Sequence, residues 1–338
     1  MVVLAGLLIA SILLACAIGA VHVPLKTILL ILLNHSGLFH FSRTWPKSDA
    51  VILLQIRLPR VAAAALVGAA LSVAGVLFQG LLRNPMADPY VIGTSGGAAL
   101  GAAVGFIISA RFSILGFGVT PTFAFVGALA TMIMVYRISR VGGRTPIVTL
   151  LLAGFAASVI LGYTMSFLLI VNNRLQLDLP VLYAWLLGGI TVTRWSQVGA
   201  IALIVAIGMG GALALGRSLN ALSLGEECAA SLGIPVELHK TVIIAVGSLL
   251  TAAAVSAGGL IGFVGLIVPH FVRLIFGPNH TTLLPLSVLG GAAFLVTADL
   301  LSRVILRPTE LPVGILTAFI GGPAFLYLLR RTKQEYRF

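Results

Sequence analysis

The chain has 338 residues, of which 59% are hydrophobic and 9% are charged, and its formal net charge is +12. Soluble domains carry about 25% charged residues, so this composition excludes an ordinary soluble globular protein. The roughly 200 apolar residues are enough for about ten membrane-spanning helices of about 20 residues each, and they leave little chain for a soluble domain.

Short breaks that hold most of the polar, proline and glycine residues separate the apolar runs. In the runs 1–20 and 60–82 the apolar residues do not alternate with polar ones, which indicates helices and not outer-membrane strands. The first run lacks the basic start and the cleavage site of a secretion signal, so we expect it to remain as a span. The sequence predicts one all-α integral membrane domain over 1–338, with about ten spans near 1–20, 60–82, 91–109, 119–137, 147–171, 197–215, 236–257, 259–269, 283–303 and 312–330.

The third and eighth runs are rich in glycine. In the third run glycine recurs every four residues along one helix face, which predicts a close-packing seam formed by Gly93, Gly97, Gly101 and Gly105. The eighth run is too short to cross a membrane alone. Gly/Pro-broken segments survive at membrane depth only when protein surrounds them, so we expect this run at the heart of the bundle, interrupted by Gly258, Gly259, Gly262, Gly265 and Pro269.

Basic residues in short loops mark the cytoplasmic side of a membrane protein. They cluster in the C-terminal tail and between the fourth and fifth spans, at Arg330, Arg331, Lys333, Arg337, Arg137, Arg140 and Arg144. With an even number of spans, both termini are then cytoplasmic. A similar number of basic residues falls on the outer side, where we expect an outer partner to use them: Lys26, Arg43, Lys47, Arg57, Arg60, Arg111, Arg174, Arg194, Arg303 and Arg307.

The sequence lacks the motifs that ATP binding and metal binding require. It contains no G-x-x-x-x-G-K-[ST] motif, so any ATP-driven role needs a partner with its own phosphate-binding loop. Cys16, Cys228 and the six scattered histidines show no metal-binding spacing. We therefore expect no metal site, no cofactor and no catalytic residue, and membrane lipid in place of nucleic acid around the chain.

Asp299 is the only acidic residue well inside a predicted span, and Arg303 follows it by four residues on the same helix face. This spacing favours a local ion pair over a proton relay. An ion- or proton-coupled secondary transporter usually has several buried ionisable groups, so it remains the second hypothesis for function.

The longest polar interruption covers 217–240 and reads RSLNALSLGEECAASLGIPVELHK. Asn220 or Ser223 could cap a short helix that ends at Gly233, and Pro235 could open the next helix. Its leucines and alanines make the segment too apolar for a solvated loop. We expect two short helices that lie across the cytoplasmic face and dock a soluble partner.

Five segments resemble the FecCD family of permeases, which includes importers of vitamin B12, haem and ferric siderophores. They are RLPR (57–60), GAALSVAGVLFQGLLRNPMADPYVIGTSGGA (68–98), LGEECAASLGIP (224–235), GFVGLIVPHFVR (262–273) and ELPVGILTAFIGGPAFLYLL (310–329). The resemblance covers about residue 55 to the end of the chain, in the order and spacing of the family.

The resemblance implies a ten-helix ABC importer subunit in the inner membrane of a prokaryote. Such a subunit pairs with a second copy, or with a similar permease, and works with two ATP-binding subunits and a periplasmic or lipid-anchored binding protein. It imports a metal chelate while a partner hydrolyses ATP. By the same resemblance the coupling segment runs from Leu219 to Pro235, with small residues that allow close seating and two acids for basic ATPase residues: Gly225, Ala229, Gly233, Glu226 and Glu227.

Two further assignments come from the vitamin B12 branch of the family. Its cytoplasmic gate uses small hydroxyl residues where this chain has Ile147 and Val148, so here the gate is expected to be a hydrophobic constriction. Its binding protein docks on arginines at the motif positions of Arg57, Arg60 and Arg303. The alternative for these arginines is snorkelling to the lipid headgroups.

Overall fold

The computed structural model describes the chain except residues 20, 38–40, 43–44, 109–112, 115, 174–175, 177–178, 307 and 336–338, and it describes the backbone but not the side chains of 328–329 and 331–335. The predicted outer residues Arg43, Arg111, Arg174 and Arg307, the tail residue Arg337, and the side chains of Arg331 and Lys333 therefore lie outside the described residues.

The described residues form a helical bundle. Every predicted span corresponds to a helix: α1 (Val2–Ala17), α4 (Leu58–Leu81), α5 (Thr94–Ile108), α6 (Val119–Ser139), α7 (Ile147–Val171), α10 (Trp195–Ala214), α13 (Val236–Gly258), α14 (Val264–Phe276), α15 (His280–Val304) and α16 (Val313–Glu335). Shorter helices join them: α2 (Leu25–His35), α3 (Lys47–Val51), the π-helix η1 (Ile52–Arg57), the 3₁₀-helix η2 (Pro89–Ile92), α9 (Leu179–Leu186), α11 (Gly216–Ser223) and α12 (Glu226–Ser231).

Not every helix is long enough to cross a membrane alone. Six described helices have that length and hydropathy, namely Lys47–Leu81, α6, α7, α10, α13 and α15. Helices α1, α2, α5, α14 and the described part of α16 are apolar but shorter. The all-α membrane fold is confirmed, while the number of about ten spans stays a prediction.

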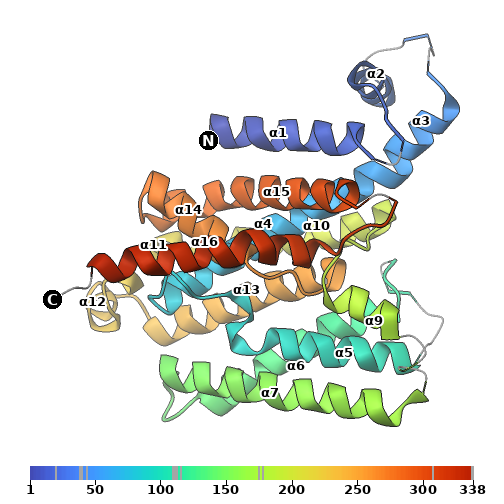
Figure 1. Ribbon diagram of the computed structural model, residues 1–338. Coiled ribbons are helices and arrows are strands. Elements are labelled where there is room, and N and C mark those ends of the chain that lie inside the picture. The colour runs from blue at the N-terminus through green and yellow to red at the C-terminus, as the bar shows by residue number, and fades with distance from the viewer. Residues whose placement is uncertain are drawn as a thin grey trace.

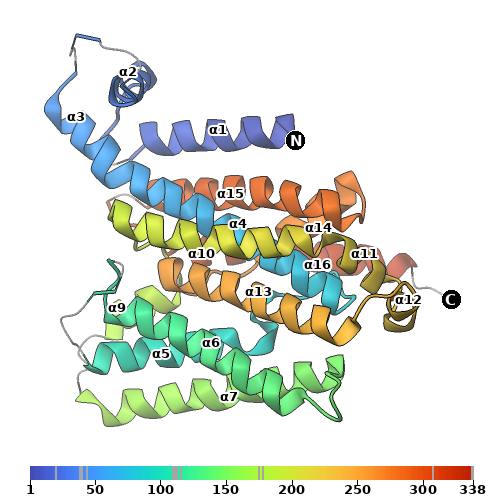
Figure 2. The same ribbon diagram turned by 180° about the vertical axis from the view of Figure 1, so that it is seen from behind.

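Both described chain ends and α12 lie at one end of the bundle, while α2, α3 and α9 lie at the other (Figure 1, and Figure 2 from behind). We call these the α12 end and the Arg60 end. The N-terminus, the end of α16 and the short helix α12 therefore share one end of the bundle.

Two helix boundaries differ from the predictions. The second span begins earlier than residue 60, because α3, η1 and α4 form one continuous helix over Lys47–Leu81. The eighth span was predicted over 259–269, but α14 covers Val264–Phe276. Gly259 and Phe263 have φ angles of 65° and 67°, which are incompatible with a right-handed helix, so the chain between α13 and α14 runs as a linker.

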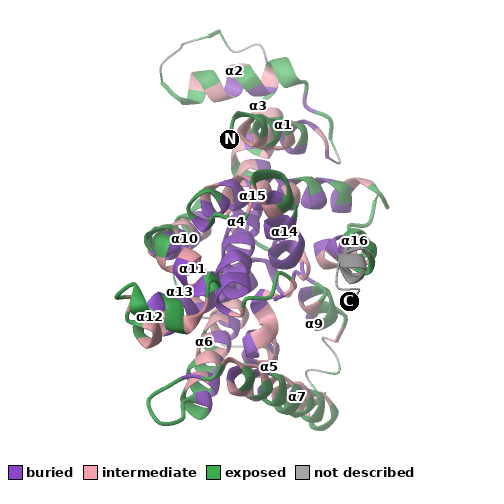
Figure 3. Cartoon of the chain, turned by 90° about the vertical axis from the view of Figure 1, so that its left-hand side faces the viewer, coloured by how far each residue is buried: buried purple, intermediate pink, exposed green. Residues whose placement is uncertain are grey.

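Helix α4 is the core of the bundle. Viewed from the α12 end, it and α14 are mostly buried, while α7, α10 and α12 expose much of their surface (Figure 3). The segment from Val264 to His270 is buried throughout, which confirms the central position expected for the broken span.

Glycine allows the backbones of the core helices to touch. A Cβ atom at Gly75 of α4 would lie 1.8 Å from the carbonyl oxygen of Gly265 in α14. One at Gly68 would lie 2.2 Å from the carbonyl oxygen of Gly291 in α15. Helices in lipid associate through close packing of this kind, since the lipid tails are as apolar as the side chains.

Three of the four glycines of the seam predicted in the third span pack as expected. The exception is Gly93, which precedes α5 with a φ angle of 86° and faces Gly154 of α7. Cβ atoms at Gly97 and Gly101 would lie 2.4 and 2.2 Å from carbonyl oxygens of α6, those of Gly127 and Phe123. Gly105 faces Thr120 of the same helix, whose Cα would lie 2.8 Å away. The seam therefore packs α5 against α6, which is a structural role.

We predict that Gly75→Ala destabilises the protein by about 1–3 kcal/mol, because the added methyl group overpacks the contact between α4 and α14. The matched control is Gly210→Ala in α10, where an added Cβ atom would meet no neighbouring group within 4 Å. Thermal unfolding in detergent should show a lower midpoint for Gly75→Ala and an unchanged or higher midpoint for Gly210→Ala. Equal midpoints would contradict the packing role of Gly75.

Candidate functional site

A cavity of about 460 Å³ opens at the Arg60 end of the bundle, and its lining includes the three arginines assigned to docking. Arg57 is only 5% exposed. Its guanidinium donates hydrogen bonds to the carbonyl oxygens of Cys16, Ala17 and Val21, where α1 ends. Snorkelling to lipid headgroups is therefore wrong for Arg57, because the side chain turns into the protein.

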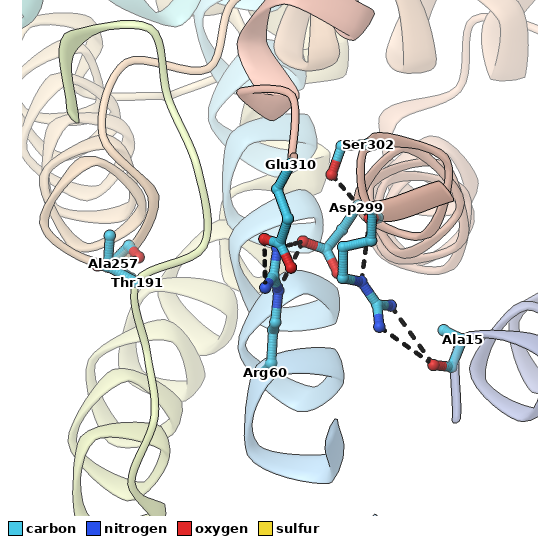
Figure 4. A network of polar contacts seen from close by, with 8 residues as sticks. Ala15, Arg60, Thr191, Ala257, Asp299, Ser302 and Glu310 are labelled. Carbon is cyan, nitrogen blue, oxygen red and sulfur yellow. Dashed lines mark hydrogen bonds and ion pairs between the residues drawn. The ribbon is translucent and has the colours of Figure 1, made fainter. Parts of the chain in front are cut away.

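Arg60 and Arg303 are held by one buried carboxylate. The Nη2 atom of Arg60 and the Nε atom of Arg303 lie 3.0 and 3.1 Å from the two carboxylate oxygens of Asp299. Arg303 also reaches the carbonyl oxygen of Ala15, and Arg60 pairs with Glu310 at 2.9 Å (Figure 4). The predicted ion pair between Asp299 and Arg303 is confirmed, and the network ties α1, α4 and α15 to the chain before α16.

The three arginines therefore lie together but differ in access. The side chain of Arg60 is 21% exposed and that of its partner Glu310 is 53% exposed, whereas that of Arg303 is 8% exposed. Arg60 thus combines a partly exposed charge with an accessible acidic partner. The docking assignment of all three residues stays a prediction, and the structure gives Arg57 and Arg303 internal roles as well.

The 217–240 segment forms two short helices, α11 and α12, as predicted. The predicted cap was wrong, because α12 begins after Gly225, whose φ angle is 119°, and no side chain caps it. Ser223 ends α11, and Asn220 lies inside α11 and bonds to the first turn of α15. The short helix ends at Ser231 with Gly233 in the left-handed conformation, and Pro235 precedes α13 as expected.

The assigned coupling residues occupy different surroundings. Leu219 and Ala229 are fully buried and anchor the two short helices. Glu227, Gly233 and Pro235 are exposed or close to the surface. The two buried side chains hold α11 and α12 against the bundle, and the exposed residues leave the outer face of these helices open to a partner.

A buried lysine links α12 to the loop before α7. Lys240 of α13 is 3% exposed, and its Nζ atom lies 2.6 Å from Glu226 Oε2 and 3.0 Å from Glu237 Oε1. The same ammonium donates to the carbonyl oxygen of Thr145 at 3.4 Å, and the backbone N–H of Thr145 donates to Glu237 at 2.9 Å. We call these four residues the Lys240 cluster.

The Lys240 cluster was not predicted. The i,i+3 spacing of Glu237 and Lys240 could have indicated a local ion pair, but no sequence signal joins either residue to Thr145, which lies 95 positions before Lys240. Glu226, assigned to the ATPase surface, uses one carboxylate oxygen internally instead of being freely solvated.

The assigned gate residues follow Thr145 at the start of α7. Val148 is 68% exposed and Ile147 is partly buried. Most of α7 is likewise uncovered, since 17% of the residues in its most hydrophobic stretch are buried. An apolar face of this size needs lipid or another protein against it.

The loop after α4 carries the Arg-Asn-Pro motif of the resemblance. Asn84 and Asp88 fix it by accepting hydrogen bonds from the backbone N–H groups of Met86 and Tyr90. Burial raises the pKa of Asp88 to about 6. The loop thereby holds Arg83, a non-glycine residue with a φ angle of 49°, at the α12 end.

The chain is a multi-pass membrane transport protein, and comparison with known proteins gives its family. The profile of the FecCD transport family matches residues 7–331. The chain belongs to this family.

Several relatives are similar over most of their length. The chain is 48% identical to the cobalamin import system permease protein BtuC of Halobacterium salinarum over 285 residues, which are 84% of this chain and 75% of that protein. It is 41% identical to the hemin transport system permease protein HmuU of Yersinia pestis, covering 87% and 89% of the two chains. A solved structure described as an inward-facing metal-chelate type ABC transporter matches with a TM-score of 0.82, 30% identity and 98% coverage of both chains.

The charge network of the Arg60 end gives a stability prediction. Asp299→Asn should destabilise the protein by about 3–5 kcal/mol, because it leaves two arginines near each other without a buried counter-charge. Glu310→Gln removes the exposed partner of the same Arg60 and should cost less than about 1 kcal/mol. Thermal unfolding of both variants in one detergent checks the ranking, and an equal loss would contradict the central role of Asp299.

Proposed function

We propose that this chain is the permease subunit of a binding-protein-dependent ABC importer that moves a metal chelate into the cytoplasm. Its family membership supports the class, and two relatives are permease proteins of a cobalamin import system and a hemin transport system, whose substrates are both chelated metals. The chain would work as one of two permease copies, with two ATP-binding subunits and an outer binding protein. A ferric siderophore, haem and a corrinoid are the candidate substrates.

The proposed orientation places the α12 end in the cytoplasm. The exposed arginines of the loop between α6 and α7, Arg140 and Arg144, lie at this end, and basic loops stay on the cytoplasmic side. The ATP-binding subunits then meet α11 and α12 from the cytoplasm. The Arg60 end faces outward, where the binding protein delivers the substrate.

The observation that supports coupling most directly is the Lys240 cluster. Movement of α12 by an ATP-binding subunit would pull on Glu226, and the ammonium of Lys240 joins Glu226 to Thr145. Thr145 stands two residues before Ile147. A displacement of the coupling segment would therefore be transmitted to the start of α7 by the buried ammonium of Lys240.

The proposed gate is apolar. Ile147 and Val148 begin α7 directly after this link, and Val148 is exposed in the single chain. In a pair of permease copies, two such residues facing each other would exclude water, which blocks the passage of a polar substrate. Movement of Thr145 would separate them.

We predict that transport needs ATP together with an intact Lys240. In proteoliposomes with the ATP-binding subunits and the binding protein, uptake should require ATP on the cytoplasmic side, and Lys240→Met should lower uptake about tenfold or more while ATP hydrolysis continues. The methionine fills the same space but leaves two acids without their counter-ion.

Two controls accompany the Lys240 experiment. Lys240→Arg keeps the charge and should recover part of the uptake. His239→Gln, at the neighbouring position, should behave as wild type, since the hydrogen bond of its ring among the described residues is a local one to Pro235. Gradient-driven uptake by the permease alone would support the secondary transporter instead. Coupled uptake by Lys240→Met at the wild-type rate would remove the cluster from the mechanism.

We predict that the binding protein docks through Arg60, with an acid of the binding protein replacing Glu310. Arg60→Gln should slow association and weaken its salt dependence, because exposed charge pairs govern encounter more than total affinity. Glu310→Gln removes the competing acid and should leave association unchanged or faster. Surface-immobilised permease in nanodiscs at low and moderate salt gives both rates, and unchanged rates for Arg60→Gln in a folded protein would contradict the docking role.

A further inference from the structure

A second cavity, of about 260 Å³, opens at the α12 end. Its walls come from the end of α4 with the following loop, from the last residue of α11, from α14 and from the first residue of α15: Gln79, Gly80, Arg83, Asn84, Pro85, Ser223, Arg273, Pro278 and His280. We call it the Arg83 cavity. No residue of its lining is acidic.

Gln79 presents a hydrogen-bond acceptor that has no partner. Its side chain is 2% exposed, and its Nε2 atom donates to the carbonyl oxygens of Gly265 and Leu266 at 3.3 and 3.1 Å. Two carbonyl partners fix the orientation of the amide, because only the NH₂ group can donate to them. The buried Oε1 atom is then an acceptor without a partner among the described residues.

His280 presents a second acceptor of this kind. Asn220 donates from its Nδ2 atom to Asn279 Oδ1, which also accepts from Thr281. Asn220 Oδ1 accordingly accepts both from the backbone N–H of His280 and from its Nδ1–H, at 2.8 and 2.9 Å. In the neutral ring Nε2 is therefore an acceptor, and it is buried without a partner among the described residues.

Two arginines add unbalanced positive charge to the Arg83 cavity. Neither guanidinium has an ion pair or hydrogen bond among the described residues, although Arg273 is half-buried and Arg83 exposed. The acids Glu226 and Glu237 at the same end are already held by Lys240, and Glu227 is exposed and does not line the cavity. Buried polar groups are normally satisfied, so Gln79 Oε1 and His280 Nε2 call for a hydrogen-bond donor beyond the described contacts.

We propose that the Arg83 cavity receives an acidic side chain of the ATP-binding subunit. Arg83 and Arg273 bind its carboxylate, as arginine forks do. A water molecule donates one hydrogen bond to that carboxylate and a second to Gln79 Oε1 or His280 Nε2. About 260 Å³ leaves room for such waters, since each takes about 30 Å³. This inference rests on the proposed function.

The position of the cavity favours this occupant over a free anion or a lipid headgroup. Ser223, the last residue of α11, forms part of its wall. A Cβ atom placed on Gly225, where α12 begins, would lie 3.9 Å from Arg83 Nη1. The cavity is thus continuous with the coupling segment, and a subunit seated on α11 and α12 reaches it without a further interface.

The test measures association of the ATP-binding subunit with the permease in phosphatidylcholine nanodiscs over a range of salt concentrations. Arg83→Gln and Arg273→Gln should each weaken binding about tenfold and reduce its salt dependence, and Arg273→Lys should recover part of the loss. The matched control is Arg140→Gln, an exposed arginine at the same end but outside the cavity, which should bind as wild type. Thermal unfolding verifies that each variant is folded.

Binding within twofold of wild type for both glutamine variants overturns the proposal. So does saturable binding of inorganic phosphate to the permease alone, measured by ³¹P NMR, that is lost in Arg83→Gln without any change in subunit association. A phospholipid retained by purified wild type and lost by Arg83→Gln, again with unchanged association, overturns it in favour of a lipid site. Failure of the wild-type permease to bind any ATP-binding subunit would instead contradict the proposed function.

Discussion

The architecture depends on how closely α4 approaches its neighbours. In lipid no hydrophobic effect draws one apolar helix onto another, so stability comes from contact at short range. At Gly68 and Gly75 the backbone of α4 touches α15 and α14 at distances that no side chain would allow. This central packing lets the short helix α14 lie at membrane depth, since its free backbone groups are surrounded by protein. Both arginine-lined cavities lie at the ends of the same helix.

Charge is concentrated where the central packing ends. At the Arg60 end Asp299 holds Arg60 and Arg303, and at the α12 end Lys240 holds Glu226 and Glu237. Each group has one nearly inaccessible ion surrounded by more accessible opposite charges. The inaccessible ion fixes the geometry of each group, while exposed acids at its edge, Glu310 at one end and Glu226 at the other, stay accessible from outside.

The sequence predicted the helices better than the contacts between them. Apolar runs bounded by proline and glycine located a described helix for every predicted span, because burial in lipid demands long apolar segments, but they did not predict short helices such as α2. The start of α14 was misplaced because its linker is apolar too, and only backbone angles such as that of Phe263 distinguish it. The burial of Arg57 could not be foreseen, since its carbonyl partners lie about 40 positions away in the chain. Polar contacts between distant parts of the chain leave no local pattern in the sequence. The contact between Lys240 and Thr145 could not be predicted for the same reason.

The continuous helix Lys47–Leu81 has 35 residues, which at 1.5 Å per residue gives a length of about 52 Å. The hydrocarbon core of a bilayer is about 30 Å thick, so even a tilted helix of this length projects well beyond it. Figure 1 shows its first turns leaving the bundle beside α2. The helix therefore extends from the core at α4 past the Arg60 end of the bundle, where α2 lies beside its first turns. An incoming protein would meet this projecting corner before it reached the mouth of the bundle.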